Sequence, residues 1–248
     1  MEFLKGHIPW NKGKKGIRLN PEFEFKKGCI PWNKGIPMSE EVKKRMSLTK
    51  HLRQANHCNL SQKAIEWING ELLGDGCLFS ESPYSAKFLY TSKYLEYIQY
   101  VVDTLKSFGI EQVGKINKCC DKRLGSYTYQ YASRAYPELL LIRKQWYPEG
   151  KKIVPKDLKL TSLTCRQWYI GDGCLEHPIS GKPHIRMGTY GFLIEDVKWL
   201  ARQLINLGIK ATRLPNNNTI NISVYSTKDF IKYIENCPIS CYQYKWAY

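Results

Sequence analysis

The sequence predicts an α/β fold, of the α+β kind, in which two similar half-domains follow an extended basic arm. Three observations support this prediction. The pentapeptide Gly-Asp-Gly-Cys-Leu occurs at residues 74–78 and again at 171–175. Each copy is followed by a stretch with the apolar spacing of an amphipathic helix that ends at a glycine. Near the N-terminus, GHIPWNK at 6–12 returns as GCIPWNK at 28–34.

Residues 1–57 form a strongly basic segment. They hold 13 Lys and Arg against 5 Asp and Glu, in a chain of 248 residues whose net charge is +16. This uneven distribution predicts a polyanionic partner that is gripped by an N-terminal arm. Gly, Pro and Lys dominate residues 5–37, so we expect an extended backbone there. Ser39 is a candidate N-cap of a basic helix, with Glu40 and Glu41 in its first turn.

The two repeats of the arm are not equivalent. The second copy, IPWNKGIPMSEEVKKRMSLTK, resembles throughout the nuclease-associated modular repeats found beside intron-encoded endonucleases, whereas the first, IPWNKGKKG, matches only their opening. The resemblance implies tethering to DNA, and two units along one chain raise affinity through effective concentration. The arm residues predicted to bind DNA are Trp10, Asn11, Lys12, Lys14, Lys15, Trp32, Asn33, Lys34, Lys43, Lys44 and Arg45.

Composition argues against several classes of protein. No apolar run reaches the roughly 18 residues of a membrane helix, and the start MEFLKGHIPWNKGKK lacks the apolar core of a signal peptide. The nine cysteines include no Cys-x-x-Cys pair, which favours free thiols in a reducing compartment over a disulfide framework or a zinc site. We therefore expect a soluble intracellular protein, in the cytoplasm or an organelle matrix, with no membrane partner.

The two half-domains are predicted at residues 58–150 and 164–248, joined by a linker at 151–163. Each contains one clearly amphipathic helix. Its apolar positions are 95, 98, 102 and 105 before Gly109 in the first half, and 197, 200, 204 and 207 before Gly208 in the second.

Alternating residue character predicts strands at 126–133 and 219–226, and further helices are expected around 135–146 and 227–236. We expect an antiparallel sheet in each half, with a polar face suited to a DNA duplex. Which face each side chain meets depends on register, because a slip of one residue reverses it. The predicted DNA contacts are Lys87, Lys115, Tyr129 and Arg134 in the first half, and Lys182, His184, Arg186, Arg213 and Asn218 in the second.

Asp75 and Asp172 each follow an apolar helical pattern at its C-terminal end. An acid there faces the negative end of the helix dipole, at a cost of about 0.3–1 kcal/mol. Together with the terminal carbonyls of Gly74 and Gly171, the two carboxylates make hard oxygen ligands of the kind that Mg²⁺ prefers. Two such helix ends side by side fit two-metal phosphodiester hydrolysis. A simple turn would explain one Gly-Asp-Gly sequence, but two copies in matching context favour a catalytic role for the two aspartates.

The paired motifs resemble those of the LAGLIDADG homing endonucleases, specifically the single-chain kind with two motifs, over roughly residues 60–248. The resemblance implies a monomer that makes a staggered double-strand break in a long double-stranded DNA target, with Asp75 and Asp172 as catalytic residues and Mg²⁺ as cofactor. The residues on family positions are Gly70, Gly74, Asp75 and Gly76 in the first copy, and Gly171, Asp172 and Gly173 in the second.

Two further segments extend the resemblance. WYPEGKKIVP at 146–155 is similar to a family linker that ends in Lys-Lys-x-x-Pro, and YQYKW at 242–246 is similar to the C-terminal Tyr-Lys element. The resemblance implies that Lys152 and Lys245 occupy the solvent pockets of the two active sites, where they polarise water or hold charge on the developing phosphorane. Exposed surface lysines are the alternative interpretation.

The helix seam departs from an even pattern. Gly70 and Gly74 are spaced for close backbone approach, whereas their counterparts are Gln167 and Gly171. We therefore expect the two motif helices to pack asymmetrically. Whether the two DNA strands are cleaved equally is then an open question.

Two other functions stay open on the sequence. One is an RNA-splicing maturase whose partner is structured intron RNA, a role known for this fold. The other is a non-catalytic DNA-binding regulator on the same scaffold. Retention of both Asp75 and Asp172 favours cleavage, since a regulator needs neither, although a bifunctional protein would keep both.

Overall fold

The computed structural model describes residues 12–13, 28, 34–121, 125–179 and 181–248. The chain divides into two compact units, residues 1–46 and 47–248, with the division inside the predicted arm. Helix α1 (Glu40–Gln54) begins as its charge pattern predicts. The Ser39 Oγ accepts the Val42 amide at 3.3 Å, and two glutamates lie in the first turn.

The second unit repeats one α-β-β-α-β-β-α pattern. The first copy comprises α2 (Gln62–Leu73), β1 (Cys77–Ser82), β2 (Ser85–Ser92), α3 (Leu95–Ser107), β3 (Asn117–Asp121), β4 (Ser126–Ala132) and α4 (Pro137–Trp146). The second comprises α5 (Ser162–Asp172), β5 (Gly173–Glu176), β6 (His184–Met187), α6 (Ile194–Asn206), β7 (Ala211–Leu214), β8 (Thr219–Ile222) and α7 (Thr227–Tyr233). Short 3₁₀ helices η2 (Pro148–Gly150) and η3 (Ser240–Trp246) follow α4 and α7.

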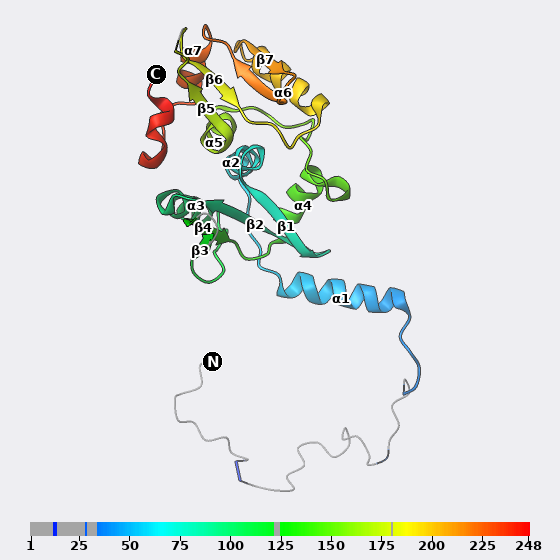
Figure 1. Ribbon diagram of the computed structural model, residues 1–248. Coiled ribbons are helices and arrows are strands. Elements are labelled where there is room, and N and C mark those ends of the chain that lie inside the picture. Colours follow the sequence, from blue (N-terminus) through cyan, green and yellow to red (C-terminus); the bar gives the residue numbers. More distant parts are fainter. Residues whose placement is uncertain (1–11, 14–27, 29–33, 122–124, 180) are drawn as a thin grey trace. The chain divides into compact units, whose positions relative to one another are not determined.

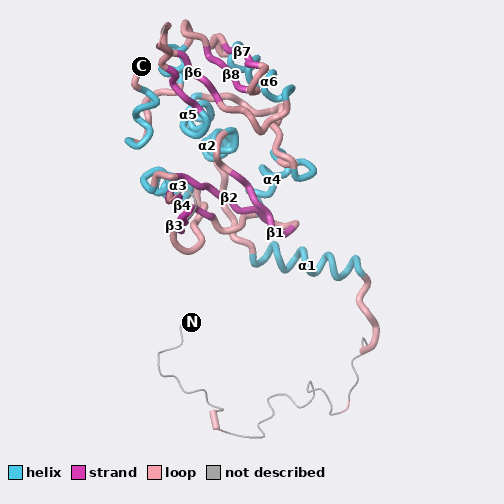
Figure 2. Tube along the Cα trace, viewed as in Figure 1, coloured by secondary structure: helices cyan, strands magenta, loops and turns pink. Residues whose placement is uncertain are grey.

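The two sheets have the same antiparallel order, β1-β2-β4-β3 and β5-β6-β8-β7. Helices α2 and α5 pack side by side between them, with one sheet beyond each (Figure 1, Figure 2). Helices α3 and α4 pack on the first sheet and α6 on the second. The predicted α/β fold of two similar halves is therefore confirmed. Among the described residues, no helix combines the length and apolar character needed to cross a bilayer.

The buried faces of the two amphipathic helices differ from the predicted apolar positions. Leu95 and Leu207, which the sequence pattern placed on the apolar faces, are 47% and 42% exposed. The buried faces are Tyr97, Ile98, Val101 and Leu105 of α3, and Asp196, Val197, Leu200, Ala201 and Leu204 of α6. Residues 98 and 197 are therefore equivalent, and so are 97 and 196. The prediction counted only aliphatic residues, but a buried tyrosine and a buried aspartate belong to these faces.

The seam between α2 and α5 is a backbone contact. A Cβ added at Gly74 would lie 3.3 Å from the Gly171 Cα, and one at Gly171 would lie 3.1 Å from the Gly74 Cα. One turn earlier, a Cβ at Gly70 would lie 2.6 Å from the Thr164 carbonyl oxygen and 2.7 Å from the Gln167 Cβ. Only α2 has a glycine at this level, as the sequence pattern indicated.

Replacing Gly70 tests this close approach. Within a helix, Gly→Ala ordinarily stabilises by about 1 kcal/mol. For Gly70→Ala we expect the opposite sign, a loss of about 1–3 kcal/mol in the free energy of unfolding, because the new methyl overlaps the α5 backbone. Urea denaturation measures the change. Gly191→Ala is the control for adding a methyl group where nothing obstructs it, since Gly191 is exposed in a turn and has open space around its Cα. A stabilised Gly70→Ala variant would mean that the helices are not in backbone contact.

Candidate active site

The two motif aspartates lie at neighbouring helix ends. Asp75 follows Gly74, which caps α2, and Asp172 is the last residue of α5. Their backbones are adjacent across the seam, because a Cβ at Gly171 would lie 3.2 Å from the Asp75 nitrogen and one at Gly74 would lie 3.7 Å from the Asp172 nitrogen. The fold thus brings together two acids that are far apart in the sequence.

The two carboxylates differ in environment. Asp75 is exposed, whereas Asp172 is partly buried. Burial, followed by the negative charge of Asp75, raises the pKa of Asp172 to about 6, while Lys152 and Lys245 oppose this rise. The site therefore holds two acids that repel each other, an arrangement that a cation would stabilise.

A lysine reaches the end of each motif helix. The Lys152 Nζ donates to the carbonyl oxygens of Gly76 at 3.1 Å and Gly74 at 3.4 Å. The Lys245 Nζ donates to those of Ile170 at 2.6 Å, Tyr169 at 3.3 Å and Gly171 at 3.3 Å. Their ammonium groups complement the negative ends of the helix dipoles. Lys245 is only 7% exposed and Lys152 is half-buried, so neither is a surface lysine.

Burial makes both ammonium groups easier to deprotonate. Desolvation lowers the pKa of Lys245 to about 8 and also lowers that of Lys152, while the nearby acids and cysteines oppose the shift. An amine whose pKa is lowered in this way can hold a proton or transfer it to a reacting oxygen. The two lysines and two aspartates form one chemical cluster across the seam.

The backbone carbonyls predicted as metal ligands are already hydrogen-bonded. Those of Gly74 and Gly171 accept from Lys152 and Lys245, respectively. In the described part of the chain, no group of three or more His, Cys, Asp or Glu side chains could hold a metal ion. Because a carbonyl oxygen has two lone pairs, these oxygens can still supplement the two carboxylates as candidate donors for a divalent cation. Hard oxygen donors of this kind fit Mg²⁺.

The first sheet has a helix-side face and an open face. Phe88 and Tyr90 of β2 are buried on the helix side, so the alternating Lys87 lies on the open face, where it pairs with Glu81 at 3.1 Å. Tyr129 of β4 instead shares the helix side with Tyr131 and packs against the core. The sheet therefore does not bring Tyr129 together with Lys87.

The second sheet divides its predicted contacts in the same way. His184 and Arg186 of β6 lie on the open face, and their side chains approach the Glu176 Oε2 to 3.1 Å and 2.8 Å. Arg213 pairs across the sheet with buried Ile220 and therefore lies on the helix side.

Asn218 has a structural task. It adopts a positive φ of 49° in the turn between β7 and β8. Its Nδ2 donates to the Phe192 carbonyl at 2.9 Å, and its Oδ1 accepts from the Arg213 Nε at 2.8 Å. The side chain of this predicted DNA contact therefore fastens the loop before α6.

The remaining predicted contacts are scattered. Lys115 and Lys182 lie exposed in loops, and Arg134 pairs with Glu111 at 3.2 Å. In the arm, Lys12, Lys34, Lys44 and Arg45 are exposed, while Lys43 pairs with Glu40 at 2.8 Å. The other predicted arm contacts lie outside the described residues; they are Trp10, Asn11, Lys14, Lys15, Trp32 and Asn33.

Sequence comparison decides the family. Residues 65–230 match the sequence profile of the LAGLIDADG DNA endonuclease family, and this stretch contains both Gly-Asp-Gly motifs. The chain belongs to the LAGLIDADG DNA endonuclease family.

This LAGLIDADG chain is similar to known proteins in fold and in sequence. The homing endonuclease I-WcaI, solved bound to its DNA recognition sequence, superposes with a TM-score of 0.65 at 18% identity, over 86% of this chain and 94% of that one. The N-terminal LAGLIDADG domain of WhiA has a TM-score of 0.45 at 11% identity, over 72% of this chain and 84% of that one. These likenesses concern the fold. An uncharacterized protein of Methanocaldococcus jannaschii is 30% identical over 151 residues, which is 59% of this chain. This chain spans only 57% of that protein's length.

Sequence reasoning missed polar residues on the open faces of this LAGLIDADG fold. They alternate along their strands with residues that the structure buries, such as Tyr131 and Ile220. Because that burial is known only from the fold, the sequence held no local signal for them. The missed residues are Thr91, Asn117 and Gln130 in the first sheet, and Thr212 and Asn221 in the second.

It also missed a buried polar cluster beneath the catalytic candidates. Glu71 of α2 is fully buried, and its Oε1 accepts from the Tyr97 hydroxyl at 2.6 Å. The Gln167 Oε1 of α5 lies 3.5 Å from the same hydroxyl. Burial raises the pKa of Glu71 to about 8, which the Tyr97 hydrogen bond opposes and the charge of Asp75 increases. An acid within the apolar run of the first motif is the signal that sequence reasoning could have used.

Proposed function

We propose that this protein is a site-specific homing endonuclease that makes a staggered double-strand break in a long double-stranded DNA target by Mg²⁺-dependent phosphodiester hydrolysis. One observation carries the proposal. Two aspartates lie at adjacent helix ends, and a separate lysine binds the carbonyls of each helix end. Two such half-sites in one chain match two strands of a duplex, which also supports a monomeric enzyme.

The carboxylates of Asp75 and Asp172 would hold the divalent cation, supplemented by carbonyl oxygens of the helix ends. Bound Mg²⁺ would stabilise the attacking and leaving oxygens of an in-line displacement. The lysines supply positive charge and hydrogen-bond donors, which carboxylates cannot. Each ammonium group donates hydrogen bonds and has a pKa lowered by burial, so it can stabilise charge on the phosphorane or pass a proton to the leaving oxygen.

DNA binding would use the open faces of the two sheets. Lys87, His184 and Arg186 lie on these faces, and polar residues accompany them. The net charge of +16 favours a polyanion, and the lysines and arginines would neutralise phosphates while the polar side chains read base edges.

Cleavage of a randomised DNA library tests the proposal. The wild-type protein with Mg²⁺ is expected to give one recurring staggered cut, and Asp75→Asn or Asp172→Asn to give none. A wild-type protein that binds DNA but never cuts it would refute the enzyme proposal. Structured intron RNA would then be the next partner to test.

Deleting residues 1–57 tests the tether. We expect the truncated protein to bind its target about 100-fold more weakly, because linked binding units raise avidity by about this factor or more. The position of the cut is expected to stay the same, since the catalytic cluster lies outside the deleted segment. Titration of labelled target DNA and mapping of the cut ends measure the two quantities. A displaced cut would contradict the tether and make the arm part of target selection.

A further inference from the structure

The segment that carries Lys152 is held by the other half of the molecule. Two residues after Lys152, the Val154 amide donates to the Asp196 Oδ2 at 3.2 Å, and the Lys156 Nζ donates to the Oδ1 at 2.6 Å. Asp196 belongs to the first turn of α6, in the second half, and is 4% exposed. Lys152 itself binds the end of α2, in the first half. A residue of one half therefore fixes the backbone beside the lysine that serves the other.

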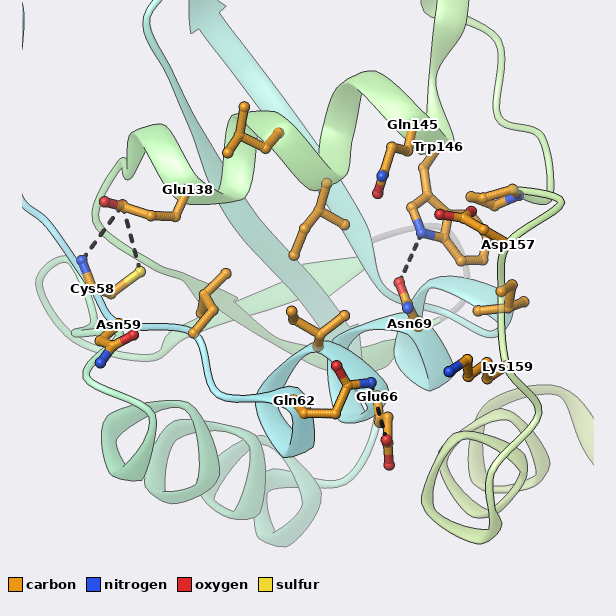
Figure 3. Close-up of a pocket in the computed structure, with 16 residues that line it drawn as sticks. Cys58, Asn59, Gln62, Glu66, Asn69, Glu138, Gln145, Trp146, Asp157 and Lys159 are labelled. Carbon is orange, nitrogen blue, oxygen red and sulfur yellow. Dashed lines mark hydrogen bonds between the residues drawn. The ribbon is translucent and has the colours of Figure 1, made fainter.

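The backbone at Ile153, directly after Lys152, is held by residues of the first half. The Ile153 amide donates to the Trp146 carbonyl at 2.8 Å, and the Trp146 indole donates to the Asn69 Oδ1 of α2 at 2.9 Å. Figure 3 shows this indole bond between two residues that line a cavity. The cavity has a volume of about 570 Å³ and is formed by residues 58–60, α2, α4 and residues 155–159, and none of the catalytic candidates lines it. Lys152 thus lies between an anchor in the first half and an anchor in the second.

The second half also covers the Lys152 side chain. The Nζ lies 5.7 Å from the centre of the Phe192 ring, which belongs to the loop before α6. Asn218 fastens this loop through the Phe192 carbonyl. The carboxylate of Asp196 and the ring of Phe192 are only four residues apart in the sequence, so one short stretch of the second half contacts both the backbone and the ammonium group.

Lys245 has the reciprocal arrangement. It binds the end of α5, in the second half, and lies on η3. Three residues earlier, the Tyr242 ring packs edge-on against Tyr94 at 5.2 Å and Tyr97 at 5.1 Å, both from the first half. The Ser240 hydroxyl donates to Glu96 beside them. Tyr97 occupies the position equivalent to Asp196, so the same site on α3 and on α6 holds the opposite lysine segment, by aromatic packing in one case and by a carboxylate in the other.

We propose that Asp196 is a positioning residue for Lys152, and that Tyr94 does the same for Lys245 through Tyr242, so that each half sets the lysine of the other half's active site. That Asp196 and Tyr94 position the two lysines does not depend on the reaction that the protein catalyses. The effect of this positioning on DNA cleavage rests on the proposed function. Without Asp196, the Val154 amide and Lys156 lose their shared acceptor, and the linker releases Lys152 from the α2 end. Lys245 keeps all of its contacts.

Competitive labelling of amines in the full chain, followed by peptide mass spectrometry, tests the placement without using activity. Asp196→Ala is expected to speed acylation of Lys152 about tenfold, the factor that corresponds to losing one hydrogen bond to a charged group, with Lys245 unchanged. Tyr94→Leu is expected to speed acylation of Lys245 alone. Equal acceleration of both lysines, or of neither, would overturn the inference, because general loosening does not select one lysine.

Two variants separate the role of the carboxylate from that of its ion pair. Asp196→Asn keeps an acceptor for the Val154 amide, and Lys156→Met removes only the ammonium partner. Both are expected to keep Lys152 near its wild-type rate. Acceleration by Lys156→Met as large as that by Asp196→Ala would refute the backbone anchor and assign the effect to surface charge.

Strand-specific nicking then tests the consequence. On target DNA labelled on each strand, Asp196→Ala is expected to slow cutting of one strand about tenfold and Tyr94→Leu to slow cutting of the other, as loss of a supporting contact does at other sites. Equal slowing of both strands would overturn the inference. If the wild type cuts no DNA, the proposed function fails, while the labelling experiment still decides where the lysines are held.

Discussion

Asp172→Asn is expected to slow cleavage strongly and, in the same protein, to raise the stability of the metal-free state. The loss of activity follows from removing one of two carboxylates that would hold the cation, and we expect it to be about 100- to 1,000-fold. The gain in stability follows from the position of the carboxylate. Burial and the charge of Asp75 raise its pKa to about 6, so the folded protein holds a proton there more readily than the unfolded chain does.

The sign of the stability effect depends on pH. Because the folded pKa lies above the unfolded value of 3.8, the contribution of this carboxyl to wild-type stability is greatest below that value and is lost as the pH rises from there through about 6. The asparagine variant does not titrate. At pH 7 we expect it to exceed the wild type by about 2 kcal/mol in the free energy of unfolding, with little gain near pH 4.

Urea denaturation without divalent cations, at pH 4 and pH 7, measures this effect. Mg²⁺ is expected to raise the melting temperature of the wild type, because a ligand that binds only the folded state stabilises it, and to raise that of the variant much less. Asp157→Asn, an exposed acid in the linker, is the control and should change stability by no more than about 0.5 kcal/mol. A destabilised Asp172→Asn variant would mean that the carboxylate supports the fold and is not held against its preference.

The duplicated pattern was enough to predict both halves of the fold. In both halves Gly-Asp-Gly is followed by a helical stretch that ends at glycine. Such spacing is a local feature of the chain, so it can be recognised in a single sequence. The close backbone approach of α2 and α5 at Gly74 and Gly171 likewise requires glycine on both helices, so the two glycines indicate it in the sequence. The two aspartates could be placed at neighbouring helix ends for the same reason.

Strand register could not be obtained in this way. Tyr129 and Arg213 lie on helix-side faces because Tyr131 and Ile220 are the residues that fill the core, and short strands of mixed polar and apolar residues do not fix that choice locally. Asn218 had the same ambiguity. Its polar side chain suits DNA, but a turn with positive φ also favours asparagine.

The positioning residues were hidden for a related reason. Asp196 stands in the first turn of a helix, where an acid is expected for the dipole alone. Only the folded chain brings the Val154 amide to it, from 42 residues away in the sequence. Contacts of this kind depend on how the two halves meet, which no single segment encodes.

Glu71→Gln is expected to flatten the dependence of stability on pH between about 4.5 and 8. Glu71 is fully buried on α2, and burial raises its pKa to about 8 from 4.5. The folded protein therefore retains this proton over a range in which the unfolded chain has lost it. The contribution of Glu71 to wild-type stability is expected to fall by about 3–5 kcal/mol as the pH rises through this range.

Glutamine imitates the protonated acid. Its Oε1 can still accept from the Tyr97 hydroxyl, and its amide replaces the Glu71 Oε2, which is buried without a hydrogen bond, as is the Tyr90 hydroxyl. Urea denaturation at pH 5, 6.5 and 8 gives the two profiles, and their difference isolates Glu71 from Asp172, which titrates in both proteins. Glu66→Gln, on the same helix, measures how much of any change comes from replacing an acid on α2.

The two profiles are expected to coincide near pH 5 and to separate toward pH 8, where the variant is the more stable protein. Above pH 8 the wild type would carry a second negative charge one helical turn before Asp75, beneath the catalytic cluster. Parallel profiles would mean that Glu71 is ionised in the folded protein throughout, stabilised by Tyr97 and its neighbours. The acid would then belong to the charge of the cluster at neutral pH, and Asp75 would work beside a permanent negative partner.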